Sequence, residues 1–563
     1  MAAGTRTFGI GETLIDPGVL PPPPTRHALL AFLVTLAAIL HIGTAPWSDV
    51  HNGAEGYYAS AALEMTRSDV APPHDPPLVQ WLIAGSYKLF GVTAAAVRLP
   101  TAAAMISSVA LTFLIGEQLA GYWRGFSAGL LHLCCLGPAI WGRIATAEPI
   151  FAATLGAVIF CATCGYQQQQ KRSIWFAGVW LFAALGFLTK GITALVYPAA
   201  IFCFLALPYR EVRVRFRLLL HWPGPLLFLA LVLPWLVWIK LHEQVAFSEI
   251  ALRWLVPFAS GNVPKANGIP LSGFLLAHGT WWFPAILLVL PGICFASRKV
   301  FRPHEFDFAD ALPLCWIAVG FLPLLFLPSR LEYHSMSMWG GFALWTASAW
   351  DRTPRALRLA GIGLVFTAGL TLGSSATAGY TLALPPLTAS EWVGLRPMVM
   401  LMALSITVSC AVAAYVVWRQ REVLGLALVL LGMVPVGLIT AEEIARSGAQ
   451  FSLANAAELV QPDLGKTGEV LYEGSPLRGS SLGFYLARRV SLVSENQQAA
   501  APGFNVGAIP PAAAVEKMAE SHPVFLIIGK NRTRYWQEQL TARFHLYHQV
   551  TTCGPHVVLS NLP

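Results

Sequence analysis

The sequence has 563 residues, of which 55% are hydrophobic and 12% charged, and its formal net charge is +8 at pH 7. A soluble core does not need so much apolar sequence, so the composition excludes an ordinary soluble globular protein and indicates a polytopic membrane protein. Arginines in cytoplasmic loops explain the positive charge better than nucleic-acid binding does, and no nucleic-acid partner is expected.

Apolar runs of membrane-spanning length follow one another through residue 441. They lie near 28–46, 95–118, 124–141, 146–166, 174–189, 191–209, 217–240, 273–296, 309–328, 333–350, 357–379, 394–418 and 422–441. This pattern predicts an all-α polytopic membrane domain over residues 1–442, with about 13 transmembrane helices.

The charges of the loops predict the orientation of these helices. With the N-terminus in the cytoplasm, the alternate loops that become cytoplasmic carry most of the arginines and lysines, which is the positive-inside pattern. The other loops carry most of the acids. An odd number of helices then places the C-terminal region outside the cytoplasm.

The first outer loop, residues 46–94, begins with the longest polar stretch among the predicted helices, which runs to about residue 77. Its acids and histidines are Asp49, His51, Glu55, Glu64, Asp69, His74 and Asp75. Such residues beside a bilayer are costly unless they face water, a metal or a substrate. Residues 54–66 and 76–91 are predicted to form helices in the membrane interface. A second outer loop is predicted at residues 241–272.

The composition changes after Glu442. Residues 443–563 are polar and alternate short apolar runs with amphipathic stretches such as 533–541. The runs read VLYEG, VSLVSE, VFLIIG and HVVLS. This pattern predicts a small extracytoplasmic α/β domain.

Several short motifs occur in a fixed order around the predicted helices. In the first loop, an acid precedes Tyr58 and Glu64-Met65. Six short motifs then follow in chain order: H-D-P-P-L-V-Q-W-L at 74–82, L-F-G-V at 89–92, V-R-L-P at 97–100, A-T-A-E-P at 145–149, L-T-K-G at 188–191 and S-R-L-E-Y at 329–333. This succession resembles the C-type membrane glycosyltransferases that use polyprenyl-phosphate sugars, such as lipid A aminoarabinose transferase and the protein mannosyltransferases. The resemblance implies transfer of a sugar from a polyprenyl-phosphate donor to a lipid, glycan or protein acceptor. It also implies the outer face of a bacterial inner membrane.

The resemblance also implies a catalytic carboxylate in the first loop. In this family an Asp-Glu pair is usually followed after two residues by Tyr, and counting back from Tyr58 puts the Glu at Glu55 and the Asp at Ala54. Glu55 is therefore implied as the catalytic acid, and a hydroxyl acceptor benefits from such a general base. Asp49 and Asp75 are the candidates to replace the missing Asp; Asp75 itself stands where the family has Lys.

The leaving polyprenyl phosphate gains charge during transfer, so fixed cations and hydroxyl donors are expected to contact it. The candidates are Lys190, Arg253, Arg330, Tyr58 and Tyr333. Each has an ordinary alternative in a membrane protein. The lysine can snorkel to the interface, the arginines can bind lipid headgroups, and the tyrosines can belong to an aromatic belt.

A bound divalent metal ion is a further possibility, with His51 and His74 as the candidate ligands. Two other functions stay open. The first is a relative that binds polyprenyl-linked lipid without transferring sugar, which Ala54 and Asp75 favour. The second is a lipid or sugar transporter. The polar residues argue against it, because they cluster at the outer ends of helices rather than near the midplane of the bilayer.

Overall fold

The computed structural model describes residues 25–67, 76–167, 172–207, 210–220, 223–242, 268–296, 307–327, 330–378, 389–495, 501–543 and 547–562. The chain divides into two compact units. The helical unit comprises Met1–His41, Ala103–Gly142 and Glu148–Ile439. The loop-and-sheet unit comprises Ile42–Ala102, Arg143–Ala147 and Thr440–Pro563. The first outer loop thus falls in one unit with the C-terminal region, whereas the predicted boundary at residue 442 groups it with the helices.

Most helices of the helical unit follow the apolar runs of the sequence, although Arg210–Phe216 lies between two runs. Ala94–Ala120 and Ala147–Gln167 begin in the loop-and-sheet unit, and Met433–Arg446 ends there. The helices are α1 (Thr25–His41), α4 (Ala94–Ala120), α5 (Tyr122–Cys134), α6 (Leu136–Trp141), α7 (Ala147–Gln167), α8 (Arg172–Lys190), α9 (Thr193–Ala206), α10 (Arg210–Phe216), α11 (Pro223–His242), α13 (Leu271–Trp281), α14 (Ala285–Val289), α15 (Ile293–Ala296), α16 (Phe308–Phe326), α17 (Trp339–Arg352), α18 (Arg355–Ala378), α19 (Ala389–Trp418), α20 (Glu422–Leu431) and α21 (Met433–Arg446). Short 3₁₀ helices η2 (Arg217–Leu220), η3 (Leu290–Gly292) and η4 (Glu332–Met338) lie among them.

Fewer of these segments are long and apolar enough to span a membrane than the 13 predicted. Within the described residues, 8 helices are long and apolar enough, or up to 9 if a pair bent by 81° at its break counts as one. The bent pair is Leu271–Trp281 with Ala285–Phe295. Two other apolar helices, α1 and α9, are shorter than a full membrane span. The predicted fold class is confirmed, and the number 13 is not.

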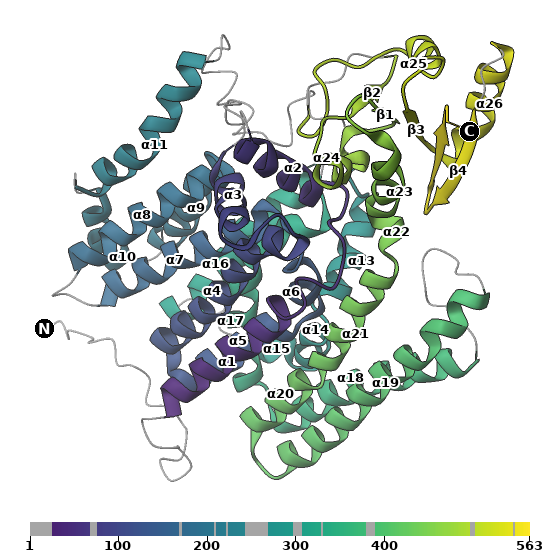
Figure 1. Ribbon diagram of the computed structural model, residues 1–563. Coiled ribbons are helices and arrows are strands. Elements are labelled where there is room, and N and C mark those ends of the chain that lie inside the picture. Colours follow the sequence, from purple (N-terminus) through teal and green to yellow (C-terminus); the bar gives the residue numbers. More distant parts are fainter. Residues whose placement is uncertain are drawn as a thin grey trace, which may run out of the picture. The chain divides into compact units, whose positions relative to one another are not determined.

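The helical unit shows the surface expected of a protein in lipid. Helices α18 and α19 pack side by side (Figure 1), yet only 22% of the most apolar 18-residue stretch of each helix is buried. Their exposed side chains include Leu370, Leu401 and Leu404. An apolar exterior is unfavourable in water and favourable in a bilayer, where backbone polar groups must be paired within the helices. Inside the unit, small residues let helices approach closely. A Cβ on Gly116 of α4 would stand 2.8 Å from Cα of Gly125 in α5.

The C-terminal residues form a five-stranded sheet with helices, as predicted. The strand order is β2-β1-β3-β5-β4. The strands are β1 (Glu469–Glu473), β2 (Ser491–Val493), β3 (Val524–Gly529), β4 (His548–Cys553) and β5 (His556–Ser560). β1 pairs in parallel with β2 and β3, and β5 pairs antiparallel with β3 and β4. Helices α23 (Ala454–Leu464), α25 (Pro511–Lys517) and α26 (Thr533–Ala542) accompany the sheet (Figure 1).

Alternation of side chains along the strands gives the sheet two apolar faces. Val470 and Tyr472 of β1 belong to a cluster with Val460 of α23. Leu471, between them, belongs to a second cluster with Trp536 of α26. Both faces of the central strands are therefore covered, which explains why β1 and β3 read as continuous apolar runs.

The first outer loop forms two helices, at the places predicted for interfacial helices: α2 (Ala54–Arg67) and α3 (Leu78–Phe90). In the loop-and-sheet unit, α2 packs on α24 (Ser481–Leu486) and on η5 (Pro476–Gly479). The remaining short elements of this unit are α22 (Gly448–Phe451) and η6 (Lys530–Arg532). The contact of α2 with residues more than 400 positions later sets the position of the loop.

Candidate functional site

The entry into α2 is fixed by hydrogen bonds from the C-terminal region. Gly53 adopts a φ of +92°, which favours glycine, and so turns the chain into the helix. The amide of Gly53 donates to Leu477 O at 2.7 Å and to Ser480 Oγ at 2.9 Å. Ser481 Oγ donates to Asn52 Oδ1 at 2.7 Å. The residues around Glu55 therefore have a defined backbone.

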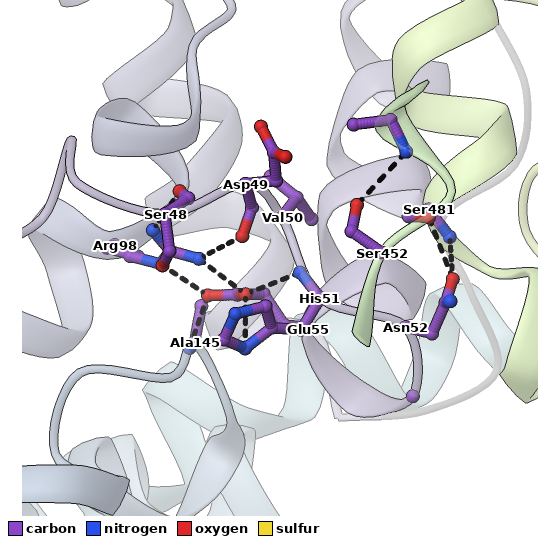
Figure 2. A network of polar contacts seen from close by, with 12 residues as sticks. Ser48, Asp49, Val50, His51, Asn52, Glu55, Arg98, Ala145, Ser452 and Ser481 are labelled. Carbon is purple, nitrogen blue, oxygen red and sulfur yellow. Dashed lines mark hydrogen bonds and ion pairs between the residues drawn. The ribbon is translucent and has the colours of Figure 1, made fainter. Parts of the chain in front are cut away.

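Glu55 lies in the first turn of α2 and is completely buried. Each of its carboxylate oxygens accepts two hydrogen bonds (Figure 2). Oε1 accepts from Arg98 Nε at 2.8 Å and from the amide of Ala145 at 3.0 Å. Oε2 accepts from Arg98 Nη2 and from the amide of His51, both at 2.8 Å. These four bonds use the acceptor capacity of the carboxylate.

Arg98, in the first turns of α4, joins this carboxylate to the preceding loop. Its Nη1 donates to Ala45 O at 2.9 Å and to Ser48 O at 2.6 Å, and its Nη2 donates to Asp49 O at 2.6 Å. Together with the two bonds to Glu55, these use all five N–H groups of the guanidinium. The buried guanidinium of Arg98 therefore has no N–H group left for another partner. Its hydrogen bonds hold the backbone of residues 45–49 against α2.

The charges of this cluster follow from burial and from the ion pair. Burial would raise the pKa of Glu55, but the charge and the hydrogen bonds of Arg98 outweigh it and hold this pKa below its usual value. Burial lowers the pKa of His51, against the opposing charge of Glu55. At neutral pH Glu55 is therefore an anion and His51 is neutral.

The carboxylate of Asp49 takes no part in the hydrogen bonds between Glu55 and Arg98. The side chain is half-buried, accepts no hydrogen bond within the described residues, and points away from Glu55 and Arg98 (Figure 2). Its backbone is held on both sides. Arg98 binds its carbonyl oxygen, and the amide of Val50 donates to Tyr485 Oη at 2.7 Å. Asp49 is therefore a positioned carboxylate that can still accept a proton.

The residues described do not make a metal site. They contain no group of three or more His, Cys, Asp or Glu side chains placed to hold an ion. Nδ1 of His51 lies 3.7 Å from Oε2 of Glu55, whose acceptor capacity is already used. The other predicted ligand, His74, lies outside the described residues.

In the helical unit, Lys190 is the last residue of α8 and is followed by a sharp turn. Gly191, which follows it, has a φ of +61°. The ammonium group of Lys190 forms an ion pair with Oε1 of Glu148 in α7 and lies 5.2 Å from the ring centre of Phe151. The second oxygen of Glu148 is buried and has no hydrogen-bond partner in the described chain.

The other described residues predicted to contact phosphate belong to different units: Tyr333 and Arg330 belong to the helical unit, and Tyr58 belongs to the loop-and-sheet unit. In the helical unit, the ring of Tyr333 in η4 packs against that of Trp141, with 5.0 Å between ring centres and the ring planes tilted by 45°. Arg330 donates from Nε to Leu327 O at 2.7 Å, while its buried Nη1 has no acceptor among the described residues. In the loop-and-sheet unit, Tyr58 is half-buried and its ring meets Tyr57 edge-on at 5.5 Å.

The structure brings together Asp49, His51 and Glu55, and within the helical unit it pairs Lys190 with Glu148. Asp75 and Arg253 lie outside the described residues, so their predicted roles stay predictions. Sequence reasoning missed Arg98, although V-R-L-P was among the motifs. The available signal was an arginine in the first turns of a long apolar helix, where an unpaired charge is costly.

Comparison with known proteins shows which sequences and folds this chain is similar to. Residues 74–238 match the family model described as dolichyl-phosphate-mannose-protein mannosyltransferase. The chain is 27% identical over 312 residues to undecaprenyl phosphate-alpha-4-amino-4-deoxy-L-arabinose arabinosyl transferase 2 of Pseudomonas fluorescens, covering 49% of this chain and 50% of that protein. It is 29% identical over 327 residues to the corresponding transferase of Aeromonas salmonicida, covering 54% and 55%. The chain thus spans about half the length of these curated relatives.

The likeness of the fold extends further than the likeness of sequence. The crystal structure of ArnT from Cupriavidus metallidurans bound to undecaprenyl phosphate superposes with a TM-score of 0.78 at 17% identity, covering 95% of this chain and 98% of that chain. The apo structure of the same protein gives a TM-score of 0.77 at 18% identity. The two chains therefore share one fold, and the predicted resemblance to the polyprenyl-phosphate-dependent membrane glycosyltransferases is confirmed.

Proposed function

We propose that this protein transfers a sugar from a polyprenyl-phosphate donor to a lipid, glycan or protein acceptor at the outer face of a bacterial inner membrane. The observation that carries the proposal is the shared fold over 95% of the chain with a protein whose crystal structure contains undecaprenyl phosphate. The names of the curated relatives, which are arabinosyl transferases, favour a pentose donor. In this proposal the N-terminus is cytoplasmic and the sheet domain is periplasmic.

The reaction exchanges one bond at the anomeric carbon of the sugar. The bond from this carbon to the phosphate oxygen breaks, and a bond to the acceptor oxygen forms. Polyprenyl phosphate leaves with the bonding electrons, and the acceptor hydroxyl loses a proton to a base. The base must have a lone pair that is free to receive this proton.

Asp49 fits the role of base better than Glu55. All the acceptor positions of Glu55 are used by Arg98 and by two backbone amides, whereas the carboxylate of Asp49 accepts no hydrogen bond in the described structure. We assign Asp49 as the catalytic residue and Glu55 as a positioning residue, which acts by holding Arg98 and so the backbone of Asp49. The catalytic role first predicted for Glu55 is untested, as are the roles of Lys190 and Arg330 in binding phosphate.

The test is sugar transfer by Asp49→Asn in reconstituted vesicles, with a panel of undecaprenyl-phosphate sugars. The change keeps the shape of the side chain and removes its basicity. General-base catalysis typically contributes about a hundredfold to ten-thousandfold, so turnover should fall by that factor while undecaprenyl-phosphate binding is kept. The matched control is Asp463→Asn, on the exposed surface of α23, which should transfer like wild type. Equal turnover by Asp49→Asn and wild type would remove Asp49 from the mechanism.

A second candidate function is binding of polyprenyl-linked lipid without sugar transfer. Two observations favour it: Ala54 stands where the family has an acid, and Glu55 is fully occupied by structural hydrogen bonds. A wild-type protein that binds undecaprenyl phosphate and transfers none of the tested sugars would establish this function instead.

A further inference from the structure

Arg143 is a half-buried cation that forms no ion pair within the described residues. It belongs to the loop-and-sheet unit, in the short segment between α6 and α7. Its Nε and Nη2 atoms are shielded from solvent and donate to no acceptor in the described part of the chain. Such an arrangement is unfavourable, because the charge loses hydration without gaining hydrogen bonds.

The surroundings of Arg143 do not compensate its charge. Burial, and then the charge of Arg98, lower the pKa of Arg143 to about 10. The side chain still carries its proton at neutral pH, because this value lies well above 7. Glu55 is saturated by Arg98, and no carboxylate among the described residues forms an ion pair with Arg143. The segment is thus left with one uncompensated positive charge.

The backbone that carries Arg143 is held against the first loop. The amide of Ala145 donates to Oε1 of Glu55 at 3.0 Å, and two residues of chain span at most about 7 Å. Two further buried polar atoms on these two segments, Oγ1 of Thr146 and Nε2 of His51, have no hydrogen-bond partner within the described residues. Groups able to donate hydrogen bonds therefore gather where Glu55 joins the two segments.

We propose that Arg143 binds the phosphate group of a lipid, with the hydroxyl of Thr146 as a second donor. The inference rests on the proposed function and adds a phosphate contact to it. A guanidinium offers two parallel N–H groups that match two phosphate oxygens, and the bound anion supplies the charge that the protein lacks there. The phosphate belongs either to the polyprenyl-phosphate donor or to a phosphorylated lipid acceptor, since the same chemistry recognises both.

The test measures equilibrium binding of two probes, undecaprenyl phosphate and phosphatidic acid, in an uncharged detergent. Arg143→Gln is compared with wild type and with Arg534→Gln, a matched control whose side chain is 91% exposed. We expect Arg143→Gln to weaken the binding of at least one probe by about tenfold to a hundredfold, as for loss of a charge-assisted hydrogen bond. Arg143→Lys should keep part of the affinity. A loss for undecaprenyl phosphate assigns the donor, and a loss for phosphatidic acid assigns the acceptor.

Stability without ligand separates a ligand contact from a structural role. Removing a half-buried charge that has no ion-pair partner in the described chain should raise the melting temperature of the ligand-free protein, whereas a fall would show a structural role and overturn the inference. Unchanged affinity for both probes in a folded Arg143→Gln variant would also overturn it, even if the wild type transfers sugar. A wild type that binds neither probe would overturn the inference together with the proposed function.

Discussion

Two buried carboxylate–cation pairs, one in each unit, differ in how completely their hydrogen bonds are satisfied. In the loop-and-sheet unit, Glu55 accepts four hydrogen bonds and Arg98 donates through every N–H group. In the helical unit, Glu148 is paired through one oxygen to Lys190, and its other oxygen is buried without a partner in the described chain.

The difference indicates different uses of similar residues. A saturated pair cannot bind a ligand or accept a proton without breaking contacts, so its contribution is to fix the backbone around it. The pair of Lys190 and Glu148 keeps spare donors on the ammonium and a spare acceptor on the carboxylate, and can engage a ligand while intact. Burial of a charged residue in a membrane protein is therefore weak evidence for chemistry until its hydrogen bonds have been counted.

The largest effect should come from breaking the saturated pair. Arg98→Met leaves Glu55 buried without its counter-charge, which should lower the free energy of unfolding by about 3–5 kcal/mol. Thermal and denaturant unfolding of the purified protein in detergent measure this change. The exposed Arg534→Met is the control, and the double variant Glu55→Gln/Arg98→Met should recover much of the loss. A stable Arg98→Met single variant would contradict the structural role of the pair.

A change in the pair of Lys190 and Glu148 should alter the affinity of the protein for the donor lipid. Lys190→Ala removes a cation predicted to contact the donor phosphate, and loss of a charge-assisted hydrogen bond costs about 1.5–3 kcal/mol, or roughly tenfold to a hundredfold in affinity. Titration with undecaprenyl phosphate measures the effect, with the exposed Lys88→Ala as control. If a folded Lys190→Ala binds the lipid as tightly as wild type does, Lys190 only snorkels beside Phe151, and the contrast between the two pairs loses its functional meaning.

The smallest effect concerns His51, which borders the saturated pair. Because burial lowers its pKa below the ordinary 6.5, the unfolded chain takes up a proton on acidification before the folded chain does. The stability contributed by neutral His51 is therefore fully present above about pH 6.5 and is lost as the pH falls toward the lower folded pKa. Melting temperatures between pH 7.5 and 5 should decline less for His51→Gln than for wild type or for the exposed control His548→Gln. Parallel declines in all three proteins would show that His51 does not titrate with folding.

Helices and strands could be predicted from the sequence where a single physical requirement, such as burial in the bilayer or in a core, applies to every residue of a segment. The bilayer requires long apolar helices, so most helices of the membrane domain were located from their apolar runs, although α10 lies between two runs. The predicted number of 13 is not confirmed, because helices such as α1 and α9 are shorter than a full span. Central strands β1 and β3 were found because both of their faces are buried. β4 was missed because HQVTTC is a mostly exposed edge strand without an apolar run.

The site was less accessible because its contacts join distant parts of the chain. Glu55 and Arg98 are separated by 43 positions, and Val50 and Tyr485 by 435. Family motifs located the acid Glu55, but only the hydrogen bonds show that it is saturated while Asp49 is open. The unpaired state of Arg143 depends on every neighbour around it, which no local pattern encodes.

Hydrogen bonds join residues 46–67 of the first loop to residues 476–486 of the sheet domain. We therefore expect these two segments to be exchangeable between relatives only as a pair. At Gly56 even an added methyl group would approach the amide nitrogen of Ser481 to 2.7 Å, so the loop fits one particular partner surface. A chimera that takes residues 46–67 from a relative, but keeps its own residues 476–486, would combine two halves shaped for different partners. We therefore expect a chimera to exchange donor or acceptor preference between relatives only when both segments are taken from the same relative.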